Sequence, residues 1–145
     1  GGWIQRARSL PPADSMAVRS YFSFARTGDL NKAGVKLLAG TDTPQPFVFP
    51  GFSVHQELEL LVRSGLTPLE ALRAATYNPA EYLGALDSLG TVGEGKVADL
   101  VLLDADPLSD IRNTRRISTV IANGRVFDRA QLNELLHRVE AALKR

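Results

Sequence analysis

Apolar residues recur every three or four positions along several stretches of the chain, and this period predicts helices. The first stretch begins near Ser15, is interrupted at Gly28 and ends at Gly34. The second begins at Ser53, keeps one apolar face for three turns and stops at Gly65. A last helix is marked by apolar residues on one face near the end of the chain: Leu132, Leu135, Leu136, Val139 and Leu143.

Two short helices between these stretches are predicted from their start signals. Thr67 is placed to cap the first of them, with Pro68 at the first helical position and Glu70 closing a capping box. Asn78 precedes a proline in the same way, so it is expected to cap the next helix, which ends at Gly84.

Apolar runs bounded by turn residues predict the strands. Residues 35–42, VKLLAGTD, form one such run, and residues 99–104, DLVLLD, read as a short strand covered on both faces. Residues 118–122 and 125–127 are separated by Asn-Gly, the pair most typical of a tight two-residue hairpin turn. The strands after residue 90 are therefore expected to pair antiparallel.

The run over 35–42 ends in Asp42, directly after Gly40 and Thr41. An ionised carboxylate at the edge of a core is costly unless a hydrogen bond, a cation or a metal compensates it. Asp42 is therefore either a turn or cap residue or part of a functional site, and its spacing alone leaves both open.

The composition excludes several classes of protein and site. The formal charge of +1 over 145 residues gives no field that favours nucleic acid or an anionic membrane. No apolar run approaches the roughly 20 residues that span a bilayer, and the start does not resemble a signal peptide. The absence of cysteine excludes disulfides and thiolate metal sites and favours a reducing, cytoplasmic location.

The order of elements divides the chain into three parts: 1–86 with the strand and its helices, 87–128 with the small strands, and 129–145 with the last helix. One strand cannot make a sheet, and the run over 35–42 has no parallel neighbour in the sequence. The chain therefore reads as part of something larger.

Three separated motifs resemble the C-terminal part of the amidohydrolase superfamily, nearest to its imidazolonepropionase-like and prolidase-like branches. They are AGVKLLAGTD, PGFSVHQELELLVRSGLTPLEALRAATYNPAEYLG and LGTVGEGKVADLVLLDADPLSDI, and they cover roughly residues 30 to 127. The resemblance implies an α/β fold, the last part of a (β/α)₈ barrel plus strands of a small composite β-sandwich. Residues 35–42 would be the eighth barrel strand, with Asp42 at its C-terminal end, where barrel active sites lie.

The resemblance also implies the roles of the site residues. Asp42 would contact a divalent metal, expected to be zinc, and accept a proton from the attacking water. The family's remaining ligands include a His-x-His pair, whereas this chain has only His55 and His137. His55 lies in a family stretch near the mouth of the active site, so it is either a substrate or supporting contact or a surface histidine. His137 lies off the apolar face of its helix and is expected to be solvated.

Phe47, Phe49 and Phe52 lie in a proline-rich loop and could line a substrate pocket or pack as a plug. The resemblance implies a metal-dependent hydrolase of a C–N bond in a small molecule or dipeptide, an amide, cyclic amide or peptide, with no nucleic acid or membrane as partner. The alternative is a truncated fragment or associating partial domain that is inert without the rest of the barrel. In either case a homo-oligomer or association with a missing N-terminal part is expected.

Overall fold

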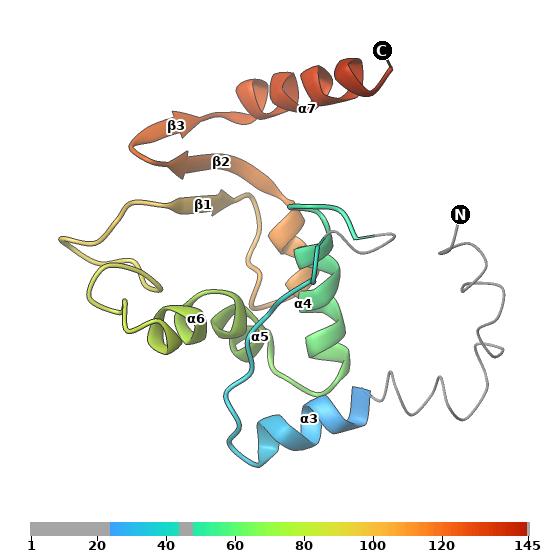
Figure 1. Ribbon diagram of the computed structural model, residues 1–145, viewed down its shortest axis with the longest axis vertical. Helices are drawn as coiled ribbons and strands as arrows, with labels where there is room; N and C mark the ends of the chain where they lie inside the picture. Colours follow the sequence, from blue (N-terminus) through green and yellow to red (C-terminus); the bar gives the residue numbers. More distant parts are fainter. Residues whose placement is uncertain (1–23, 44–47, 145) are drawn as a thin grey trace, which may run out of the picture.

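The computed structural model describes residues 24–43 and 48–144 (Figure 1). The expected helix start at Ser15 and the aromatic Phe47 lie outside the described residues. The described part holds helices and a small antiparallel sheet. None of its helices is long and apolar enough to cross a membrane.

Four helices form one layer of the molecule. Their bounds are α3 (Phe24–Lys32), α4 (Ser53–Arg63), α5 (Pro68–Ala75) and α6 (Tyr77–Tyr82). A short 3₁₀ helix, η1 (Ile111–Arg115), packs against α4. The core lies where α4, α5 and η1 meet, and its buried members are Leu58, Leu61, Leu66, Ala71, Ala74 and Ile111.

The capping box before α5 is confirmed. The Thr67 hydroxyl accepts a hydrogen bond from Glu70 N at 3.2 Å, and the Glu70 carboxylate accepts one from Thr67 N at 2.7 Å. The cap expected at Asn78 is wrong, because α6 already begins at Tyr77. The Asn78 amide instead donates to the Leu37 carbonyl at 2.9 Å and so ties α6 to the extended segment before Asp42.

Gly28 does not interrupt a helix but lies within α3, at its contact with the end of α4. A Cβ at this position would lie 2.0 Å from the Ser64 carbonyl oxygen. Glycine is therefore required here by the close approach of two backbones. Gly34 ends the helix as expected, with φ +83°.

The sheet has the order β1-β2-β3, with β1 (Leu100–Leu103), β2 (Ile117–Ala122) and β3 (Arg125–Phe127) all antiparallel. The predicted hairpin is confirmed, since Asn123 and Gly124 form its turn with φ values of 49° and 72°. The expectation that both faces of β1 are covered is wrong in this chain. Val101 is 56% exposed and Leu102 is 45% exposed, because their side chains point to opposite faces of the sheet and neither face is fully covered within the described residues.

The last helix, α7 (Arg129–Leu143), follows the sheet directly and lies beside β2 and β3 (Figure 1). Its start is fixed by a capping box in which Asp128 accepts from Gln131 N at 2.8 Å. Its predicted apolar face is largely exposed among the described residues, with Leu135 at 43%, Leu136 at 41% and Val139 at 58%. His137 is exposed on this helix, as expected.

The chain is stretched out over residues 35–42 in Figure 1, but no strand forms there and Asp42 has a left-handed φ of +53°. The strand predicted over 35–42 is therefore wrong for the described residues. Within 24–43 and 48–144 no strand lies beside this segment, and a strand needs a partner to form its ladder. The segment is held by helices instead. Ala39 N donates to the Ala74 carbonyl at 2.8 Å, and Lys36 pairs with Glu81 at 2.5 Å. The division into parts 1–86, 87–128 and 129–145 stays a prediction.

We expect Gly28→Ala to lower the free energy of unfolding by about 1–3 kcal/mol, because the added methyl group forces the backbones of α3 and α4 apart. This loss outweighs the gain of up to about 1 kcal/mol that alanine brings to a helix. Urea denaturation of the purified protein measures it. Gly93→Ala is the matched control, since its Cβ would meet only the Lys96 side chain at 3.6 Å. Equal stability of the two variants would contradict the assigned contact.

Candidate active site

Asp42 lies at the end of the extended segment, exposed and beside the loop that leads to α4. Its φ of +53° is in the left-handed region, which is uncommon for residues other than glycine but tolerated by aspartate. Two hydrogen bonds fix the backbone just before it. Ala39 N donates to Ala74 O at 2.8 Å, and Gly40 N donates to the Glu57 carboxylate at 2.7 Å.

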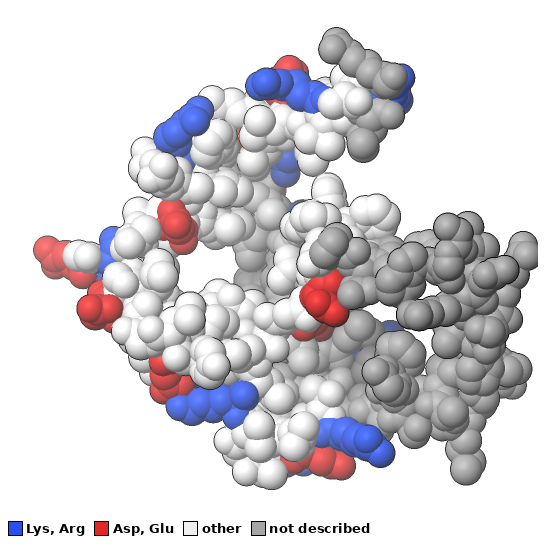
Figure 2. Space-filling model, viewed as in Figure 1, with Lys and Arg blue, Asp and Glu red and all other residues white. Residues whose placement is uncertain are grey.

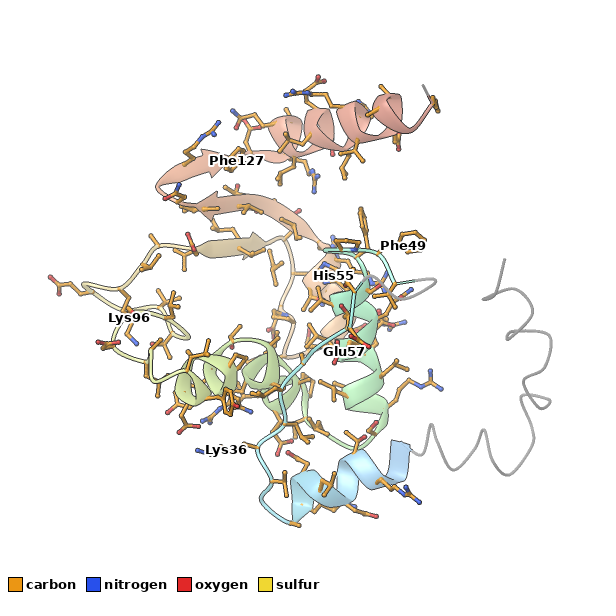
Figure 3. The ribbon with its side chains drawn as sticks, viewed as in Figure 1. Lys36, Phe49, His55, Glu57, Lys96 and Phe127 are labelled. Carbon is orange, nitrogen blue, oxygen red and sulfur yellow. The ribbon has the colours of Figure 1, made fainter. Side chains whose placement is uncertain are left out.

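His55 lies in the first turn of α4, at the end of the helix nearest the sheet (Figure 3). Its Nδ1 is 3.1 Å from the Thr114 hydroxyl oxygen, and that hydroxyl lies 2.9 Å from the Ile111 carbonyl oxygen. A threonine hydroxyl has one proton, and the Ile111 carbonyl can only accept. Thr114 therefore donates to Ile111 and accepts from His55. The neutral ring carries its proton on Nδ1 and leaves Nε2 as an acceptor.

The pKa of His55 is lowered from its ordinary value, first because burial disfavours the charged ring and then because the Arg115 guanidinium lies near. Glu59 opposes this shift, but it pairs with Arg115 at 2.6 Å, so its own charge is partly compensated. His55 is therefore held in the neutral form, as a base or hydrogen-bond acceptor requires. The surface-histidine alternative does not describe this half-buried, hydrogen-bonded ring.

His55 borders two open grooves between the helical layer and the sheet, where the molecular face is hollowed (Figure 2). One groove has a volume of about 610 Å³ and is lined by Phe52 and Ile117 together with leucines of α7. The other has about 570 Å³ and lies between α4, α5 and β1. Phe52 lines the first groove and Phe49 lines neither, although the two side chains are similarly exposed, at 61% and 63%. Asp42 lines neither groove.

The chemistry of the described residues does not fit a complete metal site. Nowhere in the described ranges do three His, Cys, Asp or Glu residues gather so that they could hold an ion. Protein sites for zinc typically use about three protein ligands or more, and Asp42 supplies one carboxylate. Positive and negative side chains are both present on the face seen in Figure 2.

Two residues of the site were missed from the sequence, Glu57 and Thr114. Glu57 contacts the backbone 17 positions earlier, and Thr114 contacts a histidine 59 positions earlier. The pattern SVHQEL contains Glu57 two residues after His55, but it carries no signal for which distant groups these side chains meet.

We expect the stability of the protein to fall as the pH drops below about 6.5, in part because of His55. Its folded pKa lies below the unfolded value of about 6.5, so the unfolded chain binds more protons below that pH. The contribution is therefore complete above about pH 6.5 and is lost as the pH falls through the folded pKa. His55→Gln should show a smaller drop in Tm over this range than the wild type.

His137→Gln is the matched control for this experiment, because His137 is the other histidine of the chain and lies exposed on α7. It should keep the wild-type drop in Tm. Equal drops for wild type and His55→Gln would show that burial of the ring does not contribute.

Comparisons with known proteins identify the family. The sequence profile described as Amidohydrolase family matches residues 19–127. An ochratoxinase of Aspergillus niger is 39% identical over 101 residues, which make up 66% of this chain and 20% of that protein. An imidazolonepropionase of Thermoplasma volcanium is 44% identical over 84 residues, 55% of this chain and 20% of that protein.

A solved structure of a putative prolidase from Bifidobacterium longum is similar with a TM-score of 0.66 and 38% identity, over 79% of this chain and 30% of that one. The chain thus spans about 20% of the length of these two curated relatives. The profile match extends over most of the described residues and includes both Asp42 and His55. The chain belongs to the amidohydrolase family.

Proposed function

We propose that the protein containing this chain hydrolyses a C–N bond in a small amide, cyclic amide or dipeptide. Membership of the amidohydrolase family is the observation that carries this proposal. The names of the similar proteins, an ochratoxinase, an imidazolonepropionase and a putative prolidase, support a small-molecule or dipeptide substrate. They do not select one among these classes.

In this proposal Asp42 is the proton acceptor. Its carboxylate is exposed at the end of the 35–43 segment, so a water molecule and a substrate carbonyl can reach it. The carboxylate would take a proton from the attacking water as the new C–O bond forms. It would then give that proton to the leaving nitrogen as the C–N bond breaks.

His55 is proposed to contact the substrate or to support the groups that do. The neutral ring offers Nε2 as an acceptor, and its Nδ1–H is engaged by Thr114. The groove of about 610 Å³ beside it is lined mainly by apolar side chains, with Arg115 and Arg129 among its lining residues. Such a lining suits a substrate with an apolar group next to a carboxylate or amide.

A divalent metal, with zinc favoured, is proposed for the whole protein. The described residues contribute Asp42 as one candidate ligand, and the others would come from outside them. In the same way we propose that residues 35–42 complete a (β/α)₈ barrel as its last strand. The apolar run over 35–39 supports this, together with the absence of a neighbouring strand within the described residues.

A non-catalytic role as an associating partial domain is the second candidate. It is favoured by the exposed apolar side chains of α7 and of the edge strand β1. Apolar surface of this kind favours association with another chain or chain segment. The partner proposed is a second copy of this chain or an N-terminal barrel part outside the 145 residues.

We expect Asp42→Asn to abolish turnover in the full-length hydrolase while leaving the fold intact. The amide keeps the shape of the side chain but cannot accept the proton, and such catalysis contributes about 10²–10⁴-fold. The assay compares rates on N-acyl amino acids, cyclic amides and Xaa-Pro dipeptides. Asp87→Asn, an exposed aspartate remote from the segment, is the control and should keep the wild-type rate. A rate for Asp42→Asn within about tenfold of wild type would sink the assignment.

The 145-residue chain by itself is expected to be inert on these substrates and to associate in solution. The free edge of β1 and the exposed side chains Leu135, Leu136 and Val139 supply the surface for association. Light scattering combined with metal analysis of the purified chain tests this. A monodisperse monomer that carries about one tightly bound zinc per chain would contradict both parts of the expectation.

A further inference from the structure

Glu57 connects α4 to the backbone that leads into Asp42. It lies on the side of the helix that faces residues 35–43, below His55 in Figure 3. Its Oε1 accepts a hydrogen bond from Gly40 N at 2.7 Å. The helix is anchored in the core next to Glu57, because Leu58 and Leu61 of α4 are both buried there. The Gly40 amide is therefore fixed relative to the core through one carboxylate.

This contact acts two residues before an unusual backbone conformation. Asp42 has φ +53°, a region that aspartate tolerates but that is uncommon for residues other than glycine. The amide of Ala39 is bound to the carbonyl of Ala74 in α5, and the amide of Gly40 to Glu57 in α4. Two successive amides are thus held by two different helices. These two hydrogen bonds together set the direction of the chain as it reaches Asp42.

The other carboxylate oxygen of Glu57 takes no part in this bond. Oε2 is buried and has no hydrogen-bond partner within the described residues. A buried acceptor without a partner costs about 1–3 kcal/mol, and more when it carries charge. The bond to Gly40 needs only one acceptor oxygen, so the amide oxygen of glutamine can take the place of the carboxylate oxygen in it.

We propose that Glu57 is a positioning residue that sets the backbone of Gly40 and thereby the orientation of the Asp42 carboxylate. This inference rests on the proposed function, in which Asp42 accepts the proton. The alternative is that Glu57 only stabilises the fold by joining α4 to residues 35–43. The two roles differ in what they do to turnover at temperatures where every variant is folded.

The test uses Glu57→Ala, Glu57→Gln and Glu57→Asp in the full-length hydrolase, with the substrate from the panel above that the wild type cleaves fastest. Glu57→Ala should lower kcat by about 10–100-fold with KM within about threefold, since a displacement of about 1 Å can cost 10²-fold in rate. Glutamine can still accept from Gly40 through its amide oxygen and should recover most of kcat. Aspartate keeps the charge but is one methylene too short, and it should not.

Glu94→Gln is the matched control, because it removes the same charge from an exposed turn and should keep the wild-type kcat. Unchanged kcat for Glu57→Ala, well below its Tm, would overturn the positioning role while leaving the proposed function in place. A rate for Asp42→Asn near wild type would instead overturn the proposed function, and this inference with it.

A second measurement does not depend on turnover. A crystal structure of full-length Glu57→Ala should show Asp42 outside the left-handed region, and one of Glu57→Gln should show it retained there. An Asp42 φ that stays near +53° in the alanine variant would overturn the proposal.

Discussion

The packing of α4 against α5 and η1 is the contact on which the rest of the described structure depends. Leu58 and Leu61 of α4 meet Ala71 and Ala74 of α5, which are both 0% exposed. Because alanines line this interface, the two helices approach closely, and Ile111 of η1 closes its remaining side. His55 and Glu57 of the candidate site belong to α4 and Thr114 belongs to η1. Asp42 belongs to the segment 35–42, which is hydrogen-bonded to α4 and α5.

The sequence predicted those parts of the fold that are determined locally. The capping box at Thr67 and the Asn123–Gly124 turn each depend on residues within a few positions of one another. All the contacts that form these features lie within a short peptide, so the local sequence pattern is enough to predict them. The same holds for the end of α3 at Gly34, where a positive φ requires glycine.

The parts that depend on distant partners were predicted less well. An apolar run over 35–42 indicates a strand only if neighbours supply its ladder, and the described residues supply helices instead. Leu102 reads as buried from composition but lies on an edge strand. For the candidate site, family motifs indicated Asp42 and His55, and their roles stay predictions, whereas the contacts of Glu57 and Thr114 were not predicted. Their contacts join positions far apart in sequence and leave no periodic signal.

The hydrogen bond between His55 and Thr114 couples ligand binding beside α4 to the docking of η1 and the sheet that follows it. Thr114 belongs to η1, which leads directly into β2, so docking of that part on α4 favours the Nδ1–H form of the ring. A ligand that needs the lone pair on Nε2 binds this form alone. Binding of such a ligand and docking of η1 must therefore favour each other by the same free energy. One threonine hydroxyl thus makes occupancy beside α4 and attachment of the C-terminal sheet a single linked equilibrium.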